Sequence, residues 1–214
     1  MARPLCGRTF RSKKQEDQAW NRETFRYFYK RGLEYFKGFD RHDSYCEVLC
    51  SSGHIKEIDP KKYEAYEKRF GDKVSHWLHE YLVDLCWRIW DRDSYHLELA
   101  LEVEWSPSPL DKDWGEPVGE DDMEEDVYKL LDVRAPMKIG ILGCSKAGKE
   151  ILKSEDQEKL TKYFASYVRF GNHLGESFLL MFVDDFNDGG VNGYLVDEKG
   201  NYDPLPRVLY RNLG

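Results

Sequence analysis

YLVDLCWRIWDRDSYHLELALEVEW, residues 81–105, contains two segments in which apolar residues occupy alternate positions. The residues between the two segments, Asp91-Arg92-Asp93-Ser94, are typical of a tight turn. Alternation with a period of two predicts strands, because successive side chains of a strand point to opposite faces of the sheet. We therefore predict a β-hairpin with strands over residues 81–90 and 95–105.

The hairpin is expected to bring acidic side chains together on one of its faces. Pairing Trp90 with His96 places Asp84 opposite Glu102, and Glu104 follows on the same face. A slip of one residue would move Asp84 to the apolar face, which burial disfavours. Opposed carboxylates repel each other, and a cation between them removes that cost. Because Mg²⁺ prefers oxygen ligands, the pattern is consistent with a metal ion between Asp84 and Glu102.

An acidic sheet face that is simply solvated is the alternative interpretation, since fold-level pattern alone does not prove a site. In that case the acids need no ligand. Arg88 on the first strand could pair with Glu98 on the second.

The spacing of Asp84 and Glu102-Val103-Glu104 resembles the motif of the PD-(D/E)xK nuclease superfamily, the restriction endonuclease-like fold. That motif is an Asp on one hairpin strand and Glu-x-Lys on the next, and the resemblance covers residues 81–142. It implies an α/β fold, a restriction endonuclease-like mixed β-sheet with helices on both faces. It also implies a metal-dependent nuclease that hydrolyses nucleic-acid phosphodiesters; DNA is the substrate we expect, and the sequence leaves RNA open as the alternative. Asp84 and Glu102 would hold Mg²⁺ (or Mn²⁺), assisted by the carbonyl of Val103.

The sequence departs from the family pattern at two positions. Glu104 stands in the Lys position, where it would serve as a metal ligand or as a base that orients water, and Val83 stands where the family has Pro. Lys129, in a helix expected over residues 124–133, is our candidate for the missing positive charge, with Lys138 on the next strand as a second candidate. Loss of the motif lysine also fits an alternative, a non-catalytic binding or assembly module with this fold.

The rest of the chain supports one α/β domain over residues 1–214, with an acidic, mobile loop at 106–125. We predict helices over residues 15–37, 59–70, 72–79, 124–133 and 154–170, and strands over 45–50, 54–58, 137–142, 178–183 and 191–197. Asp59-Pro60 is typical of a helix start, and Ser154 with Gln157 fits a capping box.

Composition limits the function classes. A net charge of −8 argues against a protein that coats nucleic acid non-specifically. The basic and aromatic stretch at residues 26–37 is interpreted as an ordinary amphipathic helix, with nucleic-acid contact as the alternative. No apolar run is long enough to span a membrane, and five cysteines give no disulfide framework, so a cytoplasmic protein is expected. A homodimer would suit double-strand cleavage, although no residue indicates one.

A further alternative is a phosphate-loop nucleotide-binding protein. Residues 143–150, GCSKAGKE, nearly match the phosphate-loop motif between an expected strand and an expected helix. FLLMFVDD at residues 178–185 resembles the strand that carries the second acidic motif of such proteins. However, Glu150 stands where a Mg²⁺-binding hydroxyl belongs, and this alternative requires an open loop that wraps the N-terminus of a helix.

A zinc site is a weaker alternative. His42, Cys46, Cys50 and His54 are spaced four residues apart and are all possible zinc ligands. The short Cys-x-x-Cys pairing is missing, so buried apolar cysteines are the simpler interpretation.

Overall fold

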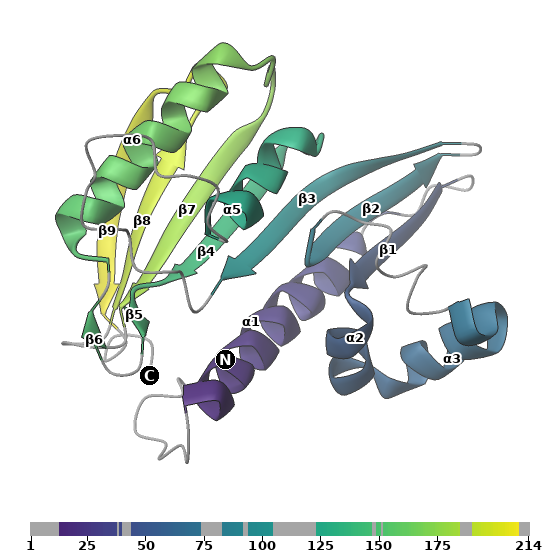
Figure 1. Ribbon diagram of the computed structural model, residues 1–214. Helices are drawn as coiled ribbons and strands as arrows, with labels where there is room; N and C mark the ends of the chain where they lie inside the picture. Colours follow the sequence, from purple (N-terminus) through teal and green to yellow (C-terminus); the bar gives the residue numbers. More distant parts are fainter. Residues whose placement is uncertain are drawn as a thin grey trace.

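The computed structural model describes residues 13–37, 39, 44–73, 83–91, 94–104, 123–146, 149–150, 152–184 and 190–209. Its centre is a seven-stranded sheet with the order β1-β2-β3-β4-β7-β8-β9, and β5 and β6 form a separate small ribbon (Figure 1). The strands are β1 (Ser44–Cys50), β2 (Leu85–Asp91), β3 (Ser94–Glu104), β4 (Met137–Gly143), β5 (Ser145–Lys146), β6 (Lys149–Glu150), β7 (Ser177–Asp184), β8 (Gly190–Val196) and β9 (Tyr202–Leu209). The helices are α1 (Lys13–Phe36), α2 (Ser52–Ile58), α3 (Pro60–Phe70), α5 (Met123–Asp132) and α6 (Ser154–Phe170), with a 3₁₀ turn at Gly71–Lys73.

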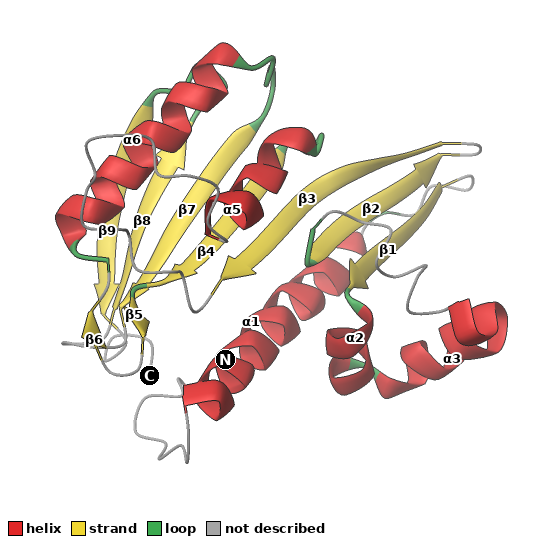
Figure 2. Cartoon of the chain, in the orientation of Figure 1, coloured by secondary structure: helices red, strands yellow, loops and turns green. Residues whose placement is uncertain are grey.

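The sheet is mixed. β1, β2 and β3 are antiparallel neighbours, β3, β4 and β7 run parallel to one another, and β8 and β9 continue antiparallel to the far edge. Parallel neighbours need a crossover connection, and α5 and α6 lie in the two crossovers, from β3 to β4 and from β4 to β7 (Figure 2). The predicted mixed α/β sheet is therefore confirmed.

Helices cover both faces of the sheet, and glycines allow the close approach. A Cβ on Gly32 of α1 would lie 2.5 Å from a methyl of Val48 and 2.7 Å from Nε1 of Trp87. On Gly140 of β4, a Cβ would meet Leu130 of α5 at 3.5 Å. The register pairs Trp87 with Leu99 and Leu99 with Met137, so Trp87 faces away from Gly140. It follows that α1 packs on one face and α5 on the other.

Buried side chains form two apolar clusters. One lies largely between α1, α2 and the first four strands and includes Phe25, Leu85 and Leu101. The other lies under α6, where Phe164 packs edge-on against Phe178 with ring centroids 5.3 Å apart. Apolar side chains of the β2–β3 hairpin thus belong to the core along most of its length, and this packing fixes the positions of the polar residues on the same strands.

Most predicted elements are confirmed, and the α3 cap is one example: the side chain of Asp59 accepts a hydrogen bond from the amide of Lys62 at 3.1 Å. The strand predicted at residues 54–58 is wrong, because that segment belongs to α2 and buries Ile55. The capping box of α6 also differs by one residue, since Lys153 is the N-cap and Asp156 accepts its amide hydrogen. β9 was not predicted. Most of the loop predicted at residues 106–125 and of the helix at 72–79 lies outside the described residues.

Candidate functional site

Asp84 lies directly before β2, next to the end of β3. Its Oδ2 accepts a hydrogen bond from the amide of Val103 at 3.0 Å, and its carbonyl accepts one from the amide of Ser51 at 3.1 Å. The predicted register holds beside it, where Leu85 pairs with Leu101. This hydrogen bond therefore holds the carboxylate of Asp84 next to the main chain of Val103, between Glu102 and Glu104 on β3.

The hairpin reaches this register through a bulge that the sequence pattern does not reveal. Near the turn Trp90 pairs with Tyr95, one residue away from the predicted partner, and the offset is absorbed between Trp87 and Arg88. The bulge redirects Glu98, whose Oε2 accepts a hydrogen bond from Tyr35 of α1 at 3.2 Å. The suggested pairing of Arg88 with Glu98 is wrong, since Arg88 pairs with Glu47 of β1.

Glu102 and Glu104 lie on the face of the sheet that α5 covers. Glu102 is next to Gly140 in the register and Glu104 is next to Leu142, both on the α5 side. Glu102 is 5% exposed, whereas Glu104 is half-buried. A buried carboxylate needs a compensating partner, so Glu102 is the more constrained of the two.

The three acids are not gathered into one three-ligand centre. Within the described part of the chain, no three or more His, Cys, Asp or Glu side chains lie close enough together to hold a metal ion. What the fold does bring together is Asp84 and the segment Glu102 to Glu104. The structure therefore does not support a site in which Asp84, Glu102 and Glu104 all bind one metal ion.

The two candidate lysines differ in their surroundings. Lys138 is fully buried, and its Nζ lies 2.7 Å from Oε2 of Glu176, at the opposite end of the parallel strands. It is therefore committed to another interaction. Lys129 is half-buried on α5, which packs on β3 and β4, and it remains the candidate for a positive charge on the Glu102 face.

Two residues near Asp84 were not assigned to this site from the sequence. The negative charge of Asp84 acts on His54 of α2 and on Cys50 at the end of β1. Burial lowers the pKa of His54, and the Asp84 charge opposes that shift; burial and then Asp84 raise the pKa of Cys50. The ring of His54 packs on Phe25 with centroids 4.1 Å apart, which holds the imidazole in place.

The proximity of His54 and Asp84 gives a direct test of the geometry. In Asp84→Asn the charge that raises the pKa of His54 is removed, so this pKa is expected to fall below its wild-type value. Titration of the His54 ring signals by NMR measures it, and Asp203→Asn, an exposed acid on β9, is the control. An unchanged His54 pKa in Asp84→Asn would show that the two groups do not interact.

The described residues around the phosphate-loop motif give that alternative no support. Ser145 pairs with Glu150 and Lys146 with Lys149 in a short antiparallel ribbon, and α6 begins only at Ser154. No open loop wraps the helix N-terminus in the described residues. Asp184, at the end of the strand that resembled a second acidic motif, is in an ion pair with Arg207 at 2.9 Å.

The zinc alternative receives no support from the described residues. Cys46 and Cys50 lie on β1 and His54 on α2, and no group of three possible ligands forms among them. His42 lies outside the described residues.

Comparisons with protein-family models, with curated proteins and with solved structures found no match. Among the described helices, none combines the length and the apolar character needed to cross a membrane.

Proposed function

We propose that this chain is a metal-dependent nuclease that hydrolyses nucleic-acid phosphodiesters. The observation that carries the proposal is the hydrogen bond from the amide of Val103 to Oδ2 of Asp84. It holds one carboxylate of the hairpin beside the Glu102-Val103-Glu104 segment, which is the arrangement that the family motif needs. The hairpin, α5 and the parallel strand β4 follow in the order that the resemblance implies, which also supports the proposal.

The donor types fit a hard divalent cation such as Mg²⁺. Asp84 and Glu102 would hold it through carboxylate oxygens, and the carbonyl of Val103 would add a third oxygen. When bound, such a cation supplies charge neutralisation at the phosphate and makes hydroxide available at neutral pH. The burial of Glu102 excludes water from one side of the site, which strengthens electrostatic interactions there.

The remaining roles fall to two half-buried residues. Glu104 would orient the attacking water and accept its proton, because its position on β3 is two residues from Glu102 on the same face. Lys129 would stabilise negative charge on the phosphate from α5. DNA is the substrate we expect, and a homodimer would suit cleavage of both strands.

A second candidate function is a non-catalytic binding or assembly module with the same fold. Two observations favour it: Glu104 occupies the lysine position, and the described acids do not form a three-ligand centre. Proteins with a given fold can lack the chemistry of their relatives, so the fold does not decide between the two candidates.

Cleavage of labelled single-stranded and duplex DNA and RNA, with Mg²⁺, with Mn²⁺ and with EDTA, tests the proposal. We expect metal-dependent cleavage that falls by about 10²–10³-fold in Asp84→Asn and in Glu102→Gln, because each loses one charged ligand. The Asn side chain still offers an oxygen to the Val103 amide, so this variant separates chemistry from folding. Asp203→Asn should cleave at the wild-type rate. Absence of cleavage on every substrate with either metal would favour the non-catalytic module.

A further inference from the structure

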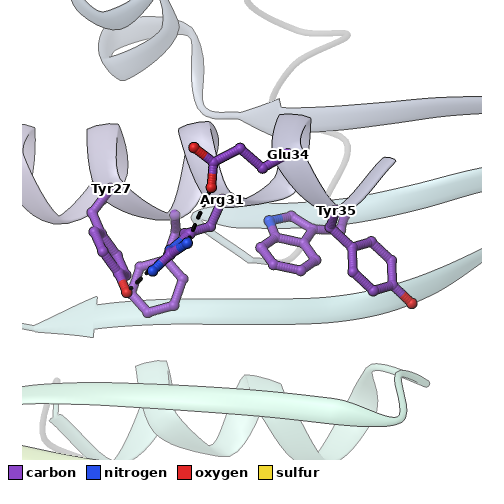
Figure 3. A pocket seen from close by; sticks show the side chains of 6 residues that line it. Tyr27, Arg31, Glu34 and Tyr35 are labelled. Carbon is purple, nitrogen blue, oxygen red and sulfur yellow. Dashed lines mark hydrogen bonds and ion pairs between the residues drawn. The ribbon is translucent and has the colours of Figure 1, made fainter. Parts of the chain in front are cut away.

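We draw no further inference here: the strongest candidate, the aromatic hollow between α1 and Trp87 of β2 (Figure 3), carries nothing, because its Arg31 is paired with Glu34, the hydroxyl of its Tyr35 donates a hydrogen bond to Glu98, and nothing in the residues that the structure describes shows what covers it.

Discussion

Glu176→Gln is expected to lower the free energy of unfolding by about 3–5 kcal/mol, because it leaves a buried lysine without its counter-charge. Nζ of Lys138 and Nδ1 of His173 each lie 2.7 Å from Oε2 of Glu176. Lys138 is fully buried and Glu176 is 6% exposed, so little water is available to replace the lost interaction. Burial lowers the pKa of Lys138, and the Glu176 carboxylate opposes that shift.

Urea unfolding followed by circular dichroism measures the effect. Glu67→Gln, on the exposed side of α3, is the control and should stay within about 0.5 kcal/mol of the wild type. Adding Lys138→Met to Glu176→Gln removes the buried charge and should recover part of the loss. A loss below about 1 kcal/mol in Glu176→Gln would contradict the assigned role of the pair.

Glu47→Gln is expected to cost about 3 kcal/mol for the same physical reason at the other end of the sheet. Glu47 accepts hydrogen bonds from Arg88 of β2 and, at 2.5 Å, from the hydroxyl of Tyr66 of α3. Arg88 is 1% exposed, and its guanidinium lies 4.6 Å from the centroid of the Trp90 ring. The carboxylate neutralises this cation and joins α3 to the first two strands.

The same unfolding experiment measures the loss, with Glu64→Gln on the exposed side of α3 as the control. A Glu47→Leu, Arg88→Met double variant replaces the pair with apolar groups and should be more stable than Glu47→Gln alone. If the double variant were the less stable of the two, a buried unpaired charge would not be the cause of the loss.

The sequence predicts those elements of the fold whose conformation is determined by residues close together in the chain. Alternating residues predict the hairpin, and Asp59-Pro60 predicts the start of α3, because in both cases neighbouring residues determine the conformation. The segment at residues 54–58 is misassigned because Ser51-Ser52-Gly53 also fits a hairpin turn, while the burial of Ile55 against the core decides for helix. Tertiary packing thus overrides a weak local preference.

The candidate site was only partly predictable. The position of Asp84 beside the Glu102 segment follows from the hairpin register. The bulge that directs Glu98 toward Tyr35 could not be predicted, because the alternation of apolar and polar residues continues through it without a change. The neighbourhood of His54 could not be foreseen, since it depends on where α2 packs. The absence of a three-ligand centre at Asp84, Glu102 and Glu104 was likewise not predictable, because spacing in the sequence does not fix the distances between side chains.

The most direct test of the central claim is the metal-dependent cleavage rate of four proteins: wild type, Asp84→Asn, Glu102→Gln and the double variant. If the two carboxylates hold one cation, removing the second adds little, and the double variant should cleave about as slowly as the slower single variant. Losses that multiply, or single variants as active as the wild type, would contradict a site shared by Asp84 and Glu102.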